Sequence, residues 1–275
     1  MAVVLFAAAL HASWNAVVKS GTNTFFTTVL VASGAALTAA LVLPLLPAPA
    51  PASWPYLGVS AVLQTLYFLL VAAAYRSGDM SLAYPLMRGS APLLVALASL
   101  PVTGEGLSGG AWAGLVLLCG GVFGLAGLPT GQATRPTRTI VLALINAGVI
   151  ACYTLVDGLG VRLSGEPAAY TLWVFLLTAL PLLAWVAWRQ PRAFFAYARA
   201  RWLLGLAGGL GTLVSYGLAL WAMTQAPIAA VAALRETSIV FAILLAVLVF
   251  KERIGRQRLL ATASILAGAM LLRLA

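Results

Sequence analysis

Long apolar runs, each bounded by proline, glycine or charged residues, dominate this chain. A helix needs about 20 apolar residues to cross the hydrocarbon core of a bilayer, which is about 30 Å thick. Ten runs reach or approach this length, and the last one spans only if the arginines at both ends extend their head groups to the interfaces. The runs are Ala2–Val18, Thr24–Leu46, Trp54–Tyr75, Ser81–Leu100, Ala111–Leu128, Thr139–Val161, Tyr170–Trp188, Trp202–Met223, Ile228–Phe250 and Leu259–Leu272. The sequence therefore predicts an all-α integral membrane protein with ten transmembrane helices.

The composition excludes an ordinary soluble domain. Hydrophobic residues make up 63% of the chain and charged residues 8%, whereas a soluble protein carries about 25% charged residues. Basic residues outnumber acidic ones 16 to 6. In a soluble chain this excess would suggest a nucleic acid partner, but in a membrane protein it is the usual bias of the loops. We expect membrane lipid and a small-molecule substrate as partners, and no nucleic acid.

Few residues are available for chemistry with a metal or cofactor. Cys119 and Cys152 lie inside apolar runs and are expected to be packing thiols, and the chain has a single histidine. The sequence shows no phosphate-binding loop and no Ser/His/Asp set. We therefore expect no metal, no cofactor, no ATP-driven motor and no enzymatic activity. A membrane-embedded enzyme or lipid-handling protein stays open as a less favoured alternative.

An internal repeat appears when the chain is compared with itself at a shift of 147 residues. Apolar identities carry no weight in this composition, but Arg88 then meets Arg235 and Glu105 meets Glu252. The shift predicts a first five-helix repeat in residues 1–130 and a second in residues 139–275. Because each repeat has an odd number of spans, the second copy crosses the membrane with opposite polarity. Such inverted repeats are typical of secondary transporters, which bind substrate near the midplane between the copies.

The chain resembles the EamA-type transporters of the drug/metabolite transporter superfamily. The resemblance rests on the two copies of five spans, on Trp14 and Asn15 in the first span, and on the segment Leu244–Leu272 (LLAVLVFKERIGRQRLLATASILAGAMLL). It implies alternating access and export of amino acids, aromatic or neutral, and related metabolites across a bacterial inner membrane. Multidrug or nucleobase efflux is the alternative within transport. A chain with both repeats is expected to function as a monomer.

Four charged residues inside the spans are candidates for a coupling site or an ion pair: Arg88, Asp157, Arg235 and Glu236. Asp157 and Arg235 lie at similar depth and are predicted to pair, with Glu236 as the competing partner. The first repeat offers Arg88 no acid at its depth, so Arg88 is predicted to bind the substrate carboxylate. Structural roles stay open, because the arginines can hold helices together or reach the interface, as can Asp157.

Polar and aromatic side chains at helical spacing are expected to line the substrate site. Tyr84 lies one turn from Arg88, and His11 lies one turn from Asn15. The other expected substrate-binding residues are Trp14, Tyr67, Tyr153, Tyr216 and Trp221. For each aromatic residue, core packing is the competing interpretation. For His11 a proton-carrying role and a hydrogen-bonded structural role both stay open.

Glycines, prolines and two loop acids suggest local structure. Gly120 and Gly124, and likewise Gly205 and Gly209, form small-residue steps that let helices approach closely in lipid. Glu105 and Glu252 are expected to cap helices. Pro85 and Pro92 are expected to loosen the helix that carries Arg88.

Charge in the loops predicts the orientation of the chain. Of the basic residues in the loops, only Arg162 and Arg273 lie on the side of the chain termini. By the positive-inside rule, this distribution predicts that the termini are non-cytoplasmic. The resemblance implies the reverse orientation. The basic residues of the opposite side are Lys19, Arg76, Arg135, Arg138, Arg189, Arg192, Arg199, Arg201, Lys251, Arg253, Arg256 and Arg258.

Overall fold

A computed structural model describes residues 1–19, 23–77, 80–126, 137–248 and 255–275, and this part of the chain is entirely helical. The helices are α1 (Ala2–Lys19), α2 (Thr24–Val42), α3 (Trp54–Ser77), α4 (Met80–Thr103), α5 (Gly109–Ala126), α6 (Thr137–Ser164), α7 (Pro167–Arg189), α8 (Pro191–Met223), α9 (Ile228–Arg235), α10 (Ser238–Leu248) and α11 (Arg256–Leu274). Two short 3₁₀ turns, Leu43–Leu45 and Pro51–Ser53, connect α2 with α3.

The helices account for the ten predicted spans. Eight spans in the described residues are long and apolar enough to cross a membrane, and the shorter apolar helices Ala2–Ser13 and Gly109–Leu125 complete the set. One of the eight, Ile228–Leu245, is built from α9 and α10 together. Large apolar side chains such as Leu45, Leu97 and Met270 are exposed on the outer surface, as contact with lipid requires. The all-α membrane fold is thus confirmed.

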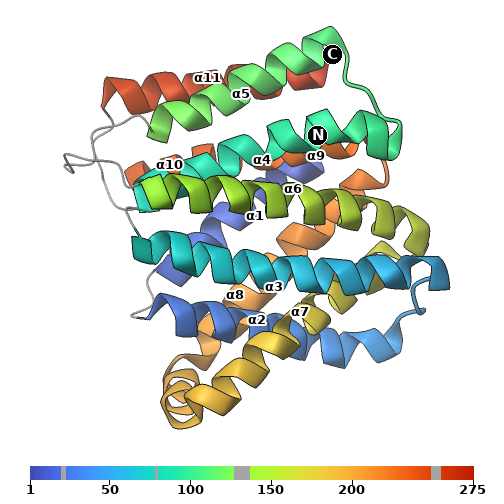
Figure 1. The fold of residues 1–275 in the computed structure, drawn as a ribbon, viewed down its shortest axis with the longest axis vertical. Coiled ribbons are helices and arrows are strands. Elements are labelled where there is room, and N and C mark those ends of the chain that lie inside the picture. Colours follow the sequence, from blue (N-terminus) through green and yellow to red (C-terminus); the bar gives the residue numbers. More distant parts are fainter. Residues whose placement is uncertain (20–22, 78–79, 127–136, 249–254) are drawn as a thin grey trace.

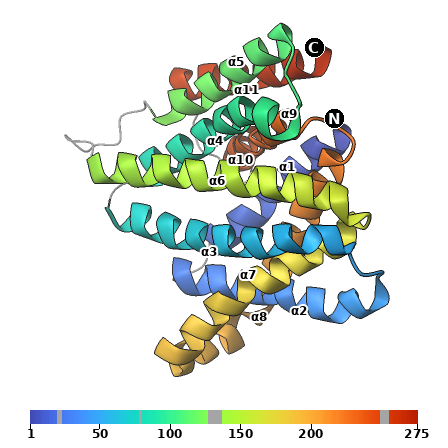
Figure 2. The ribbon, with the colours of Figure 1, turned by 45° about the vertical axis from the view of Figure 1, so that its right-hand side comes forward.

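The helices lie roughly side by side, with α5 and α11 at one edge and α2, α7 and α8 at the other (Figure 1). Helices α1, α3, α4 and α6 lie between these edges. The two chain termini are on the same side of the bundle in both views (Figures 1 and 2). An even number of crossings, five in each of two repeats, gives this arrangement.

The helix pairs follow the inverted repeat. When each helix of the first half is exchanged for its counterpart in the second, the packing of α3 on α6 becomes that of α8 on α1, and α4 on α6 becomes α9 and α10 on α1. All of these helix pairs are in contact. The contact of α2 with α8 likewise has a counterpart in the contact of α7 with α3. The two halves therefore interlock as two inverted five-helix repeats.

Close approach of α5 and α11 depends on glycine. A Cβ atom on Gly268 would lie 2.5 Å from the carbonyl oxygen of Gly114, and one on Gly121 would lie 2.7 Å from that of Ala261. The shift of 147 residues converts one of these contacts into the other, because it takes Gly114 to Ala261 and Gly121 to Gly268. The prediction for Gly205 is confirmed, because a Cβ there would meet Leu30 at 2.5 Å.

The step predicted at Gly120 and Gly124 is wrong. A Cβ on Gly120 would meet nothing within 4 Å, and one on Gly124 would make only ordinary contact, at 3.7 Å. These two glycines share a face of α5 with each other, whereas Gly114 and Gly121, about two full turns apart, share the face that packs on α11. The composition of the run does not distinguish the two faces.

Two helices extend through segments where the sequence favours an interruption. Helix α4 is continuous from Met80 to Thr103 although Pro85 and Pro92 lie inside it, so the prolines do not break the helix, and the loosening expected from them stays a prediction. The segment 189–201, which lies between two of the predicted spans and carries four of the basic loop residues, is largely helical, because α8 begins at Pro191 and bends at Arg201, where φ is −133° and ψ is 26°. The hydroxyls of Tyr197 and Thr27 lie 2.6 Å apart, which fixes this extension to α2.

Candidate functional site

An enclosed ion pair joins Arg88 and Glu236. Arg88 lies in α4, and Glu236 directly follows the last residue of α9. The Nε–H of Arg88 donates to Oε2 of Glu236 over 2.9 Å, and the side chains are only 11% and 5% exposed. Removing two charges from water is costly, and their attraction offsets part of that cost. The pair therefore fixes the end of α9 to α4, and it corrects the expectation that Arg88 has no internal acid.

Asp157 in α6 is fully buried and accepts hydrogen bonds from three other helices. Its Oδ2 accepts from the Tyr216 hydroxyl at 2.5 Å and from the Gln64 amide at 3.2 Å, and its Oδ1 accepts from the Tyr170 hydroxyl at 3.1 Å. These donors replace the water that a buried carboxyl group has lost. Asp157 thus holds α3, α7 and α8 against α6, and the alternative that its side chain reaches the interface is wrong.

The pairing predicted between Asp157 and Arg235 is not formed. The guanidinium carbon of Arg235 lies 4.9 Å from the centroid of the Tyr216 ring, and the hydroxyl of the same tyrosine is bonded to Asp157. Tyr216 therefore contacts both residues and takes the place of a direct ion pair. Successive residues on a helix point about 100° apart, and it is Glu236, rather than Arg235, that faces an oppositely charged partner.

The other predicted site residues gather around these groups. The rings of Tyr67 and Tyr153 meet edge to face at 5.9 Å, and Tyr84 lies one turn from Arg88 on α4. His11 lies on α1, which packs against α8, α9 and α10. The side chains of His11, Tyr67, Tyr84 and Arg235 are only half-buried. Accessible polar surface inside a helical bundle is what binding of a solute requires.

The comparisons with known proteins agree with this architecture. The sequence profile of the EamA-like transporter family matches residues 137–274. The chain belongs to this family. An EamA-like transporter is a membrane protein without enzymatic activity that carries out secondary transport of small solutes.

Solved structures show the same fold as this EamA-like transporter. Twenty-eight chains of known structure match it, and one of them, described only as "Crystal structure of protein", has a TM-score of 0.82. That alignment covers 99% of this chain and 97% of the other at 19% sequence identity. Among curated proteins no sequence matches the chain.

Three of the predicted substrate-binding residues are not placed at this centre. Trp14 and Asn15 belong to α1, but their side chains lie outside the described part of the transporter. Trp221 near the end of α8 is 46% exposed and is therefore not enclosed with the other residues. Its role in substrate binding stays a prediction.

The ninth span of the transporter is interrupted beside the ion pair, which the sequence analysis missed. Helix α9 ends at Arg235 and α10 begins at Ser238. Between them the Thr237 amide donates to the Leu234 carbonyl at 3.2 Å, and the Thr237 hydroxyl donates to the same oxygen at 2.7 Å. The turn is thus tighter than an α-helix and contains neither proline nor glycine. The only signal was four consecutive polar residues, Arg235, Glu236, Thr237 and Ser238, in an apolar run.

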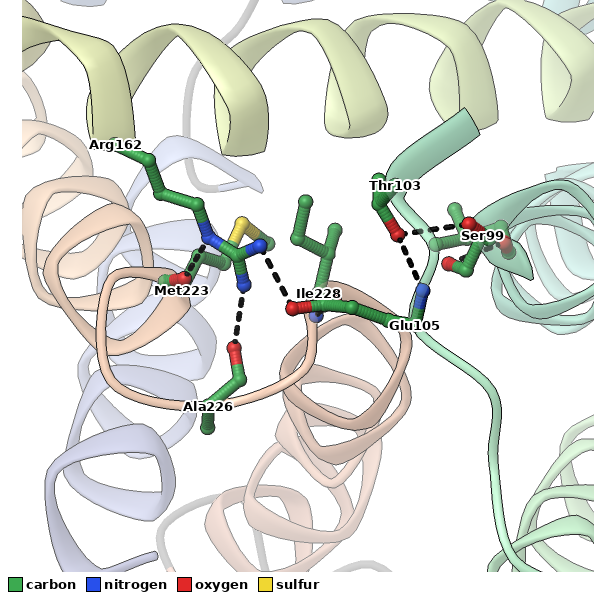
Figure 3. A network of polar contacts seen from close by, with 8 residues as sticks. Ser99, Thr103, Glu105, Arg162, Met223, Ala226 and Ile228 are labelled. Atoms are coloured by element: carbon green, nitrogen blue, oxygen red, sulfur yellow. Dashed lines mark hydrogen bonds and ion pairs between the residues drawn. The ribbon is translucent and has the colours of Figure 1, made fainter. Parts of the chain in front are cut away.

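A second network of polar contacts lies on the side of the bundle that carries the termini (Figures 1 and 3). Arg162 at the end of α6 forms an ion pair with Glu105 at 2.7 Å and donates to the carbonyl oxygens of Met223 at 2.7 Å and Ala226 at 2.9 Å. The other oxygen of Glu105 accepts the amide of Ile228 at 3.0 Å. We call these five residues the terminal-side latch.

The latch connects the α4–α5 loop of the first repeat with α6 and with the α8–α9 turn of the second. Its contact with Ile228 agrees with the helix-capping role predicted for Glu105, although the capped helix is α9 rather than a neighbour in sequence. Glu252, the predicted counterpart, lies outside the described residues. The sequence analysis missed Arg162 as its partner, although both belong to the few charges expected on this side.

Proposed function

We propose that this EamA-like transporter moves amino acids and related metabolites, aromatic or neutral, outward across a bacterial inner membrane. The observation that carries the proposal is the central cluster of charges, in which Arg88 is paired with Glu236 and Arg235 lies over the ring of Tyr216. A guanidinium group suits the carboxylate of an amino acid, and Tyr67 and Tyr153 offer apolar ring surface to its side chain. The outward direction and the membrane rest on the resemblance to amino acid exporters of the family.

Alternating access between the two repeats is the proposed mechanism. Residues 1–130 and 139–275 form the repeats, and Arg88 of the first meets Glu236 of the second in the cluster. A solute bound there contacts both repeats, so a rocking motion of one against the other transfers its access from one side to the other. The symmetric helix pairs support this division. Because one chain contains both repeats, we propose that the monomer is the functional unit.

Counterflow in liposomes tests the proposed substrate class. Purified protein is reconstituted into vesicles that contain an unlabelled solute, and the entry of the same solute in labelled form is measured against empty vesicles. The panel contains phenylalanine, leucine and threonine, together with a nucleobase and a lipophilic cation. We expect counterflow with at least one amino acid. Counterflow only with the nucleobase or the cation would establish the efflux alternative and overturn the proposal, as would the absence of amino acid flux in an active preparation.

A further inference from the structure

The charges of the central cluster are unequally matched. Glu236 is bonded to Arg88, whereas within the described chain no carboxylate lies at ion-pair distance from Arg235. Arg88, Glu236 and Arg235 together carry one net positive charge. An unpaired charge inside a membrane protein is costly and marks a functional site by default. Arg235 therefore differs in kind from Arg88, whose guanidinium group already has its anion.

Among the described residues, Arg235 is held in place by an aromatic ring and by no carboxylate. Its guanidinium group lies over the face of the Tyr216 ring, an attractive arrangement that leaves the N–H donors of the group at its edge. Tyr216 cannot turn away, because its hydroxyl is bonded to the fully buried Asp157 and its ring packs edge to face on Phe175 at 5.9 Å. Asp157 is in turn fixed by Tyr170 and Gln64. The donors of Arg235 are thus oriented in advance of binding.

We propose that Arg235, rather than Arg88, is the carboxylate receptor of this transporter. A planar guanidinium group matches a carboxylate with two parallel hydrogen bonds, and a bound carboxylate supplies the negative charge that Arg235 lacks among the described residues. Tyr216 and Asp157 act as positioning residues, and the pair of Arg88 with Glu236 is structural. The inference rests on the proposed function and narrows it, because every transported solute must then carry a carboxylate group. It replaces the expectation that Arg88 meets the substrate.

Binding of an acid and its amide to the same purified protein tests the assignment. L-phenylalanine and L-phenylalaninamide differ in the group that Arg235 would contact, and their dissociation constants are measured by calorimetry. We expect wild type to prefer the acid. Charged hydrogen bonds contribute about 1.5–3 kcal/mol, so Arg235→Gln should weaken binding of the acid about ten- to a hundredfold and leave the amide within about threefold. Because acid and amide are compared on one preparation, the ratio does not depend on the fraction of folded protein.

Three variants separate binding from positioning. Arg235→Lys keeps the charge and loses the planar fork, and Tyr216→Phe keeps the ring but loses the bond to Asp157. Both should lose part of the preference for the acid, and less of it than Arg235→Gln. Arg189 is the matched control, because its guanidinium group also lies over an aromatic ring, that of Trp188 at 4.3 Å, but at the exposed end of α7. Arg189→Gln should bind like wild type.

The outcomes distinguish this inference from the proposed function. If wild type binds phenylalanine and Arg235→Gln keeps the full preference for the acid, or loses acid and amide equally, the assignment of Arg235 is wrong while amino acid transport stands. A loss of preference in Arg189→Gln equal to that in Arg235→Gln would also overturn it. If wild type binds neither compound and gives no counterflow with any amino acid, the proposed function itself fails.

Discussion

Arg88 and Glu236 stabilise each other in a place that water hardly reaches. Removing one partner leaves an uncompensated buried charge, which in proteins costs about 3–5 kcal/mol. We therefore predict that Glu236→Gln lowers the midpoint of thermal unfolding in detergent markedly. The measurement is a melting curve of the purified variant beside wild type.

The double variant Arg88→Met with Glu236→Leu is the control for this prediction. Replacing a whole buried pair by apolar side chains of similar size is often neutral or stabilising. The double variant should therefore recover most of the lost stability. If Glu236→Gln melts like wild type, the pair contributes nothing to the fold, and the structural role assigned to it is contradicted.

The sequence identified the charged residues of the centre but not their partners. The depth of a residue in the membrane follows from counting residues along its helix. By depth alone, Asp157 and Arg235 are expected to form an ion pair. Rotation about the helix axis decides which of two neighbours faces a given partner, and it depends on how the helices pack. Tyr216 also contacts both groups, with its ring against Arg235 and its hydroxyl bonded to Asp157, in place of a direct ion pair between them. Residue types were thus predictable, whereas pairs between helices were not.

At the scale of elements, the contact of α5 with α11 yields a prediction with a built-in control. A Cβ atom on Gly268 would lie 2.5 Å from the oxygen of Gly114 and from the amide nitrogen of Leu118, which are backbone atoms that cannot rotate away. Overpacking of this kind costs about 1–3 kcal/mol, so Gly268→Ala should destabilise the protein. Gly120→Ala on α5 meets nothing within 4 Å and should be neutral or slightly stabilising. Equal melting temperatures of the two variants would refute this packing.

The terminal-side latch leads to a prediction about opening. Glu105→Gln removes the ion pair with Arg162 and should favour states that are open on the side of the termini. The reporter is Ala229→Cys, a position in the first turn of α9 that is 1% exposed, in a background without Cys119 and Cys152. A hydrophilic maleimide should label this cysteine several-fold faster when Glu105 is replaced. Unchanged labelling would mean that the latch does not control access.

The sequence predicts a helix where the length of an apolar run determines it. It does not predict the features that are determined by contacts between helices. The ten spans follow from the thickness of the bilayer. The interruption at Glu236 and Thr237 does not, because it lacks proline and glycine and occurs where Glu236 bonds to α4. In α4 the surrounding helices keep a continuous helix despite Pro85 and Pro92. Tertiary packing thus overrides local signals in both directions.

At the scale of the whole molecule, the orientation in the membrane is a prediction of charge alone. Arg162 and Arg273 lie on the side of the termini, whereas the basic extension Pro191–Arg201 lies on the other. The positive-inside rule therefore predicts non-cytoplasmic termini. A green fluorescent protein fused to the C-terminus should stay dark, and alkaline phosphatase at the same position should be active. Bright fluorescence would reverse the orientation.

The most direct test of the central claim, transport of amino acids recognised by their carboxylate, is trans-stimulation in vesicles. Entry of labelled L-phenylalanine is measured into vesicles that contain either unlabelled phenylalanine or phenylalaninamide at equal concentration. A carrier returns faster with a bound substrate, so the account predicts strong stimulation by internal phenylalanine and little or none by the amide. Equal stimulation by both compounds, or none by phenylalanine, would contradict it.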